Sequence, residues 1–300
     1  MSGLSFKTDM QFAYGEATEM VPGVVRLVAP NASPLTFKGT NTYLVGTDTL
    51  AVIDPGPDDQ SHLDAILGAA AGRPITHILA THSHRDHVDG LDALRARTGA
   101  KTYAFPHTAR QTTRAGGIVA SEYTNHDFPL DVVLEHDSKI AGDGWQLTAL
   151  HTPGHAPDHV CFALENTGVV FCGDHVMAWN TTVVAPPEGR MTDYMRSLEL
   201  LLARDDELLL PGHGGRITAA RRTVKAYLLH RRWRDQAILD AVRAGTDTVR
   251  KLLPVIYKDL DRGVVGAATA SLRAHVEHLI ERGHVACDNT GDIDAHIAAL

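Results

Sequence analysis

The chain has 300 residues, enough for one large or two ordinary domains, and its 44% hydrophobic and 21% charged residues are typical of a globular protein. A formal net charge of −8 argues against indiscriminate binding of phosphate backbones, which depends on Lys and Arg, although a local basic stripe remains compatible with it. Scattered cysteines (Cys161, Cys172 and Cys287), an N-terminus without an apolar core and no membrane-length apolar run predict reduced thiols in a soluble, cytoplasmic protein.

The first third of the chain predicts alternating strands and helices. Residues 1–20 are polar and mixed, and we expect a loosely attached arm. Apolar runs predict strands over 24–28, 41–46, 49–53 and 75–80, with a helix over 61–71 whose apolar residues share one face. After residue 88 we expect a helix to about 98, a strand over 101–105 and a loop over one edge at 106–130.

Three imidazoles and a carboxylate follow the predicted strand over 75–80. His82, His84, Asp86 and His87 stand within six residues, and nitrogen and oxygen donors of this kind suit zinc. Histidines two positions apart on a turn can share one ion, and the displaced pair Asp86 and His87 can hold a second. The alternative interpretation is a solvated polar loop.

The same arrangement recurs along the chain, where further strands are expected over 132–134, 145–150, 159–164 and 169–172. Predicted apolar strands end at His82, before His151 and His155, at Asp174 and at His213. Ligands gather at the carboxyl ends of such strands, so we predict that these donors converge on two ions with one carboxylate between them. Spacing alone does not choose between His151 and His155. The predicted donors are His82, His84, Asp86, His87, His155, Asp174 and His213.

Asp54 stands at the end of another predicted strand, before Pro55-Gly56-Pro57. The local pattern favours a carboxylate that caps the turn. The alternative is a carboxylate that orients a metal-binding histidine from behind.

Together these motifs resemble the metallo-β-lactamase superfamily of hydrolases. The matching elements are Asp54, His-x-His-x-Asp-His from His82, Thr-Pro-Gly-His ending at His155, Gly-Asp at Asp174 and Pro-Gly-His at His213, in about residues 24–217. The resemblance implies an α/β fold, a four-layer αβ/βα sandwich with the site along one edge.

The resemblance also assigns roles. It implies that His82, His84 and His155 bind the first ion, that Asp86, His87 and His213 bind the second, that Asp174 bridges them and that Asp54 supports the site from behind. Two close cations deprotonate a shared water near neutral pH and polarise the electrophile. We therefore expect a dinuclear metal-dependent hydrolase that uses a metal-bridging hydroxide, with Asp86 and Asp174 as catalytic residues. Two Zn²⁺ ions are the expected cofactors, and Mn²⁺ or iron suits the same ligands.

The chain after residue 220 reads differently. Residues 218–244 predict a long helix made locally basic by Arg221, Arg222, Lys225, Arg231, Arg232 and Arg234. A helix through 255–257 capped by Asp247, a helix over 267–282 and a small β-hairpin over 283–292 resemble the winged-helix tail of the lactamase-β-like endoribonuclease subgroup. We predict a catalytic domain at 1–220 and, at 221–300, the basic helix with a winged-helix-like domain.

Three functions remain open at this stage. The subgroup resemblance and the basic helix favour cleavage of single-stranded RNA. The overall acidity and a glyoxalase II-like core favour hydrolysis of a small-molecule thioester or other acyl ester. A non-enzymatic nucleic-acid-binding regulator is the third, disfavoured because such a protein has no need of converging metal donors. For the winged helix we favour a structural role, which includes a possible homodimer contact, over nucleic-acid binding.

Overall fold

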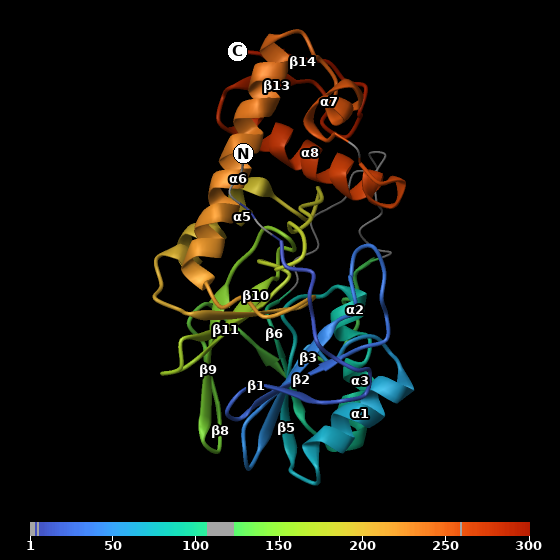
Figure 1. Ribbon diagram of the computed structural model, residues 1–300, viewed down its shortest axis with the longest axis vertical. Coiled ribbons are helices and arrows are strands. Elements are labelled where there is room, and N and C mark those ends of the chain that lie inside the picture. Colours follow the sequence, from blue (N-terminus) through green and yellow to red (C-terminus); the bar gives the residue numbers. More distant parts are fainter. Residues whose placement is uncertain (1–3, 5, 107–122, 259) are drawn as a thin grey trace.

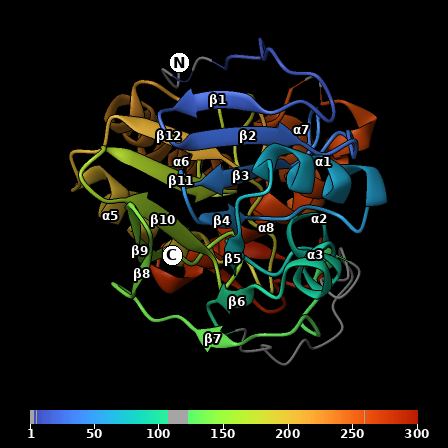
Figure 2. The same ribbon diagram turned by 90° about the horizontal axis from the view of Figure 1, so that it is seen from below.

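Two β-sheets lie face to face, with helices on their outer faces and a small domain at one end (Figures 1 and 2). The computed structural model describes residues 4, 6–106, 123–258 and 260–300. The loop predicted at 106–130 lies largely outside these residues. No helix among them is both long and apolar enough to cross a membrane.

The first sheet runs from β1 to β7 in chain order. Helices α1 and α3 cover its outer face, where Leu63 and Leu91 join Leu44 and Val52 in one buried cluster. The elements are β1 (Thr18–Val21), β2 (Val24–Val28), β3 (Asn41–Val45), β4 (Leu50–Ile53), α1 (Gln60–Ala70), β5 (Ile75–Leu79), α2 (Arg85–Val88), α3 (Leu91–Thr98), β6 (Lys101–Ala104) and β7 (Val132–Val133).

The second sheet has the order β12-β11-β10-β9-β8, and its outer face packs on α5 and α6. Its inner face meets the first sheet, where Phe162 and Phe171 pack with Tyr43 and Leu79. Because both faces are covered, β10 and β11 are almost continuously apolar. The predicted four-layer αβ/βα sandwich is confirmed. The elements are β8 (Lys139–Gly142), β9 (Trp145–His151), β10 (Val160–Leu164), β11 (Val169–Gly173), α5 (Met191–Leu202), β12 (Leu208–Pro211) and α6 (Ala220–Arg243).

Helix α6 belongs to both parts of the molecule. Its first half contributes Tyr227 to the outer core of the second sheet, and its second half contributes Ile238 to a separate core with Leu252 and Leu272. The winged-helix-like fold of this second part is confirmed, whereas the domain boundary at residue 220 stays a prediction. The remaining elements are α7 (Val249–Ile256), η1 (Arg262–Val264), α8 (Val265–Glu281), β13 (Val285–Cys287) and β14 (Ile297–Ala299).

Two expectations about the catalytic part were wrong. Residues 1–20 are not simply a loose arm, since the Lys7 N–H donates to the Ala178 carbonyl and Thr18–Val21 pairs with β2 as a strand. The helix after residue 88 is interrupted, because the Gly90 N–H donates to Gly56 and a Cβ on Gly90 would lie 2.8 Å from the Pro57 carbonyl oxygen.

The C-terminal part also corrects two details. The cap of α7 is Thr248, whose side chain accepts from the Lys251 N–H, while Asp247 pairs with the Lys251 ammonium group. The predicted hairpin over 283–292 has its second strand later, at Ile297–Ala299, because the 289–292 turn continues into an irregular connection.

Replacing Phe162 by Ala should destabilise the catalytic domain by about 3–5 kcal/mol, since the ring is fully buried between the sheets and its loss leaves a cavity. Urea unfolding measures the change. Val133→Ala, at a position that is 57% exposed, is the control and should alter the free energy of unfolding little. Equal effects of the two variants would contradict the assigned core.

Candidate metal centre

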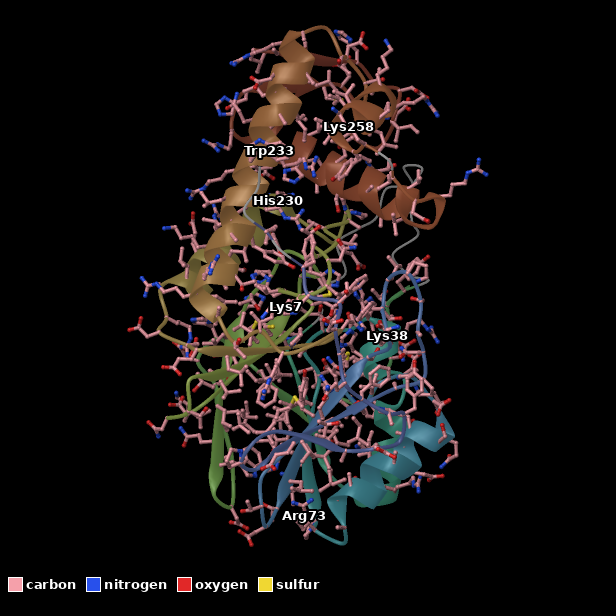
Figure 3. All side chains as sticks on the ribbon, viewed as in Figure 1. Lys7, Lys38, Arg73, His230, Trp233 and Lys258 are labelled. Carbon is pink, nitrogen blue, oxygen red and sulfur yellow. The ribbon has the colours of Figure 1, made fainter. Side chains whose placement is uncertain are left out.

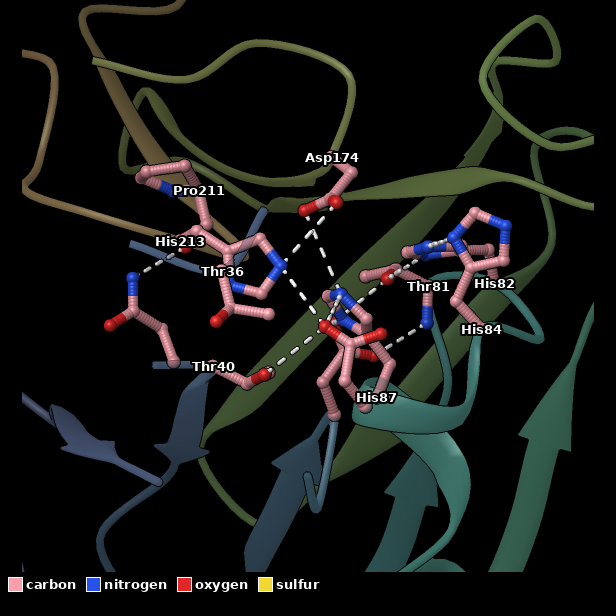
Figure 4. A network of polar contacts seen from close by, with 12 residues as sticks. Thr36, Thr40, Thr81, His82, His84, His87, Asp174, Pro211 and His213 are labelled. Carbon is pink, nitrogen blue, oxygen red and sulfur yellow. Dashed lines mark hydrogen bonds and ion pairs between the residues drawn. The ribbon is translucent and has the colours of Figure 1, made fainter. Parts of the chain in front are cut away.

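All seven predicted donors converge at one end of the two sheets. Figure 4 labels His82, His84, His87, Asp174 and His213 among them. His82 follows β5, and Asp86 and His87 lie in the first turns of α2. His155 lies in the turn after β9, while β11 and β12 lead into Asp174 and His213. The two sheets therefore contribute from opposite sides.

The first group consists of His82, His84 and His155. The Nδ1 atom of His84 lies 2.9 Å from Nε2 of His82 and 3.0 Å from Nε2 of His155. A proton on the Nδ1 atom of His84 can form a hydrogen bond with only one of the two Nε2 atoms. Nitrogen lone pairs that point into the same space are therefore left without a partner. This arrangement suits a cation.

The second group consists of Asp86, His87 and His213. Oδ2 of Asp86 lies 3.2 Å from Nε2 of His213 and 3.5 Å from Nε2 of His87. Oδ2 of Asp174 lies 3.4 Å from Nε2 of His213 and 3.7 Å from Nε2 of His155, which places this carboxylate between the two groups. The grouping is the one the resemblance implied, and the ligand roles themselves stay a prediction.

Four of these histidines have their other ring nitrogen fixed from behind. The Nδ1–H groups of His155 and His213 donate to the carbonyl oxygens of Val183 and Gly39, at 2.6 Å and 3.2 Å. Nδ1 of His82 contacts the Thr81 hydroxyl at 3.0 Å. Such contacts set the tautomer and aim Nε2 inward, as metal-binding histidines require. The fourth is His87, which contacts Asp54.

Asp54 supports the site rather than merely its own turn. Its carboxylate accepts from the backbone N–H and the hydroxyl of Thr81, at 2.7 Å and 2.8 Å, and lies 2.8 Å from Nδ1 of His87. It is buried and has φ of +52°, a strained conformation for a residue other than Gly. The local interpretation as turn chemistry was wrong because the partners are distant in sequence.

Burial and charge oppose each other in this cluster. Burial, together with the nearby imidazole of His155, lowers the pKa of His84 to about 3. Burial also acts to lower the pKa of His87, but the carboxylates of Asp86, Asp54 and Asp174 outweigh it and raise that pKa to about 9. The carboxylates thus favour positive charge beside them, which a bound cation can supply.

The donor set fits divalent cations by a second criterion. Among the described residues, Nε2 of His87 and Oδ1 of Asp174 are buried and have no hydrogen-bond partner. Buried polar atoms normally have one. Both atoms belong to the converging cluster, so a bound cation satisfies them.

The structure also decides between His151 and His155. Nε2 of His151 contacts the Pro157 carbonyl at 3.0 Å, and its ring stacks on Phe105 with centroids 4.0 Å apart. Nε2 of His159 is likewise engaged, because it accepts a hydrogen bond from the backbone N–H of Asp174 at 3.2 Å. His155 is therefore the residue that reaches the cluster.

A cavity of about 280 Å³ opens onto the cluster. Sequence reasoning missed its other walls, because they come from loops and from the C-terminal domain and carry no metal-ligand pattern. Burial, with help from the Asp158 carboxylate, raises the pKa of Glu188 in one wall to about 6. The lining residues outside the cluster are Ser33, Leu35, Thr36, Arg85, Tyr123, Met177, Val183, Ala185, Pro186, Glu188 and Ala267.

The basic helix offers a smaller basic surface than its sequence suggested, because two of its arginines are buried. Arg231 and Arg234 are buried and donate to the carbonyl oxygens of Thr182 and Ile256. Arg221 and Arg232 pair with acidic residues at the surface (Asp205 and Glu199). Four of the six basic residues between Arg221 and Arg234 are thus engaged within the chain.

Comparison with known proteins agrees with the fold. A family model described as "Metallo-beta-lactamase superfamily" matches residues 35–213, and one described as "Beta-lactamase associated winged helix domain" matches residues 248–292. The "Beta-lactamase-like protein 2 homolog" of Drosophila melanogaster is 28% identical over 93% of this chain and 95% of its own length.

Two further relatives are informative. The "Atrochrysone carboxyl ACP thioesterase AgnL7" of Paecilomyces divaricatus is 30% identical and covers 90% of this chain and 84% of its own. The structure of a beta-lactamase domain protein from Burkholderia ambifaria is 20% identical and superposes with a TM-score of 0.81 over 97% of this chain and 96% of that one. This likeness shows that the two share a fold.

Asp54→Asn should weaken binding at the second metal group by roughly 10–100-fold, because an amide cannot accept from all three donors that face the carboxylate. Zn²⁺ titration of metal-free protein measures the affinity. The exposed neighbour Asp58 gives the control, Asp58→Asn. Undiminished affinity of Asp54→Asn for both ions would refute the supporting role.

Proposed function

The chain belongs to the metallo-beta-lactamase superfamily and is a hydrolase, and from this premise we propose that it hydrolyses acyl thioesters or related acyl esters at a centre of two divalent metal ions. The observation that carries the proposal is the largely apolar cavity beside the metal-binding cluster.

The cavity favours an uncharged acyl group over a polyanion. Leu35, Met177, Val183, Pro186 and Ala267 supply apolar surface to its walls. Such surface binds a hydrocarbon group by removing it from water.

The charges around the cavity favour the same substrate. Among the described lining residues, Arg85 is the one Lys or Arg, and its guanidinium is 3.0 Å from the Asp89 carboxylate. Glu188, Asp86 and Asp174 place carboxyl groups around the same space. An RNA backbone would bring negative charge toward them, whereas a thioester would not. The name of the Paecilomyces relative, a thioesterase, supports this choice.

The proposed ligands are those that the geometry groups together. His82, His84 and His155 would hold the first ion, Asp86, His87 and His213 the second, and Asp174 would contact both. When bound, two such ions bring the pKa of a shared water toward neutrality and polarise the acyl carbonyl. Zinc is the metal that the donor set favours, with manganese or iron as alternatives.

The protein's own residues have distinct tasks in this reaction. The apolar wall orients the acyl group and excludes bulk water from the carbonyl carbon. Asp86 faces the cavity, accepts from the Thr40 hydroxyl at 3.3 Å and is placed to pass a proton to the leaving sulfur. The carbon–sulfur bond breaks as the carbon gains the oxygen of water, so the products are a carboxylic acid and a thiol.

Cleavage of single-stranded RNA is the competing hypothesis. It rests on the resemblance of the C-terminal part to the endoribonuclease subgroup, but the burial of Arg231 and Arg234, which donate to backbone carbonyls, reduces its electrostatic support. The cytoplasmic location and a homodimer stay predictions.

A substrate panel separates the two hypotheses. We expect turnover of acyl thioesters with apolar acyl groups and little cleavage of single-stranded RNA oligonucleotides. Turnover should fall by roughly a hundredfold or more in Asp174→Ala and after chelation, because both remove the centre that activates water. Asp205→Ala, which changes an aspartate that is 94% exposed, is the control. Efficient RNA cleavage without thioester turnover would reverse the assignment.

Ala267→Phe should narrow the acyl cavity, since this half-buried residue of α8 lines it. We expect KM to rise by roughly tenfold for bulky acyl thioesters, which is the effect of a misfit of about one or two methylene groups in an apolar pocket. KM should change little for acetyl thioesters. Val265→Phe adds the same bulk at a nearby exposed position and serves as the control. A uniform effect on all acyl lengths would contradict the role of Ala267 in the cavity.

A further inference from the structure

The imidazole of His155 is oriented by a loop that does not belong to either sheet. Its Nδ1–H donates to the Val183 carbonyl oxygen at 2.6 Å, so Nε2 points toward His84 and Asp174. Val183 lies in the connection between β11 and α5, which has no regular secondary structure. An irregular loop holds a carbonyl in place only if its neighbours fix it.

Two buried side chains from the helices of the C-terminal part fix this loop on either side of Val183. Arg231 on α6 donates from its guanidinium to the Thr182 carbonyl, and the Ser271 hydroxyl on α8 accepts from the Val184 N–H at 3.3 Å. The exposed fractions are only 2% for Arg231 and 6% for Ser271, so neither contact competes freely with water. Figure 3 labels His230 and Trp233, which lie close to Arg231 in the sequence, on helix α6.

The other inward-facing histidines are held differently. Nδ1 of His87 contacts Asp54 at the end of β4, Nδ1 of His213 contacts the Gly39 carbonyl just before β3, and Nδ1 of His82 contacts Thr81 just after β5. These partners belong to the first sheet and its loops. His155 thus differs from them in depending on α6 and α8, and it belongs to the first metal group.

We infer that Arg231 and Ser271 are positioning residues through which the C-terminal part of the chain sets the affinity of the first metal group, with little effect on the second. The inference rests on the proposed dinuclear centre. A shift of the Thr182–Val184 segment lengthens the hydrogen bond between the Val183 carbonyl and Nδ1–H of His155. The imidazole of His155 can then rotate, which makes its Nε2 a poorer metal ligand. Neither residue touches a metal ligand directly.

The experiment compares two arginines of the same helix. Arg231→Met removes the donor to Thr182, whereas Arg234→Met removes another buried arginine whose partner is the Ile256 carbonyl within the C-terminal part. Both should lower the melting temperature. The metal-free full-length proteins are titrated with Co²⁺, followed by its visible absorption, and with Zn²⁺ against a competing chelator.

We expect Arg231→Met to lower the affinity for one of the two ions by roughly 10–100-fold and to leave the affinity for the other unchanged. The absorption of its remaining tightly bound Co²⁺ should match that of His155→Ala. Arg234→Met should bind both ions as the wild type does. Arg231→Lys should recover part of the affinity, because an ammonium group can also donate to the Thr182 carbonyl. Ser271→Ala removes the second anchor with a smaller change in structure and should weaken the same ion.

Three outcomes overturn the inference. The first is wild-type affinity for both ions in Arg231→Met and Ser271→Ala, and the second is an equal loss of both ions. If Arg231→Met does not fold, Ser271→Ala alone decides. The third is a wild-type chain that binds fewer than two ions, which would overturn the proposed dinuclear centre as well. Wild-type binding of two ions with unaffected variants refutes only the positioning role.

Discussion

The site depends on the burial of carboxylates and imidazoles at van der Waals distance from one another. The carboxylates of Asp54, Asp86 and Asp174 each lie within 3.7 Å of a ring nitrogen of His87. Water is largely excluded from these groups except Asp86, whose side chain is 29% exposed. Such a cluster is costly unless positive charge compensates it. Two bound divalent cations would supply this positive charge between the carboxylates and the imidazole nitrogens. The rest of the structure serves to hold these groups in place against their preference for water.

Local backbone features show how tightly the cluster is confined. A Cβ on Gly212 would lie 2.6 Å from Oδ1 of Asp174 and 2.7 Å from the His87 ring, so only Gly fits beneath these residues. Gly154 has φ of +140°, and a Cβ there would lie 2.3 Å from the Cα of Tyr194 on α5. The turn that presents His155 can therefore approach α5 closely. These glycines explain why Pro-Gly-His motifs accompany the donors.

The C-terminal part is joined to the catalytic part by more than a linker. Helix α6 runs through both cores, Ala267 on α8 forms part of the cavity wall, and Arg231 and Ser271 hold the loop behind His155. Arg231 and Arg234, two of the arginines that made α6 look like a nucleic-acid surface, are directed inward, because long side chains with delocalised charge can satisfy buried carbonyl groups. Two residues of a basic helix thus have a structural role, in that they bind backbone carbonyls inside the protein, and the composition of the helix did not reveal this role.

Short-range patterns in the sequence determined most of the strands and the residues that converge at the site, because apolar strands followed by His or Asp deliver those side chains to one sheet edge whatever the details of the loops. The four-layer sandwich followed from the family resemblance of those motifs. The role of Asp54 could not be read locally, since its partners Thr81 and His87 are brought to it only by the pairing of β4 with β5. The choice of His155 over His151 needed the turn geometry or the family pattern. The apolar cavity, the inward arginines and the loop that holds His155 were decided by tertiary structure alone, because they join segments far apart in the chain that have no spacing rule between them.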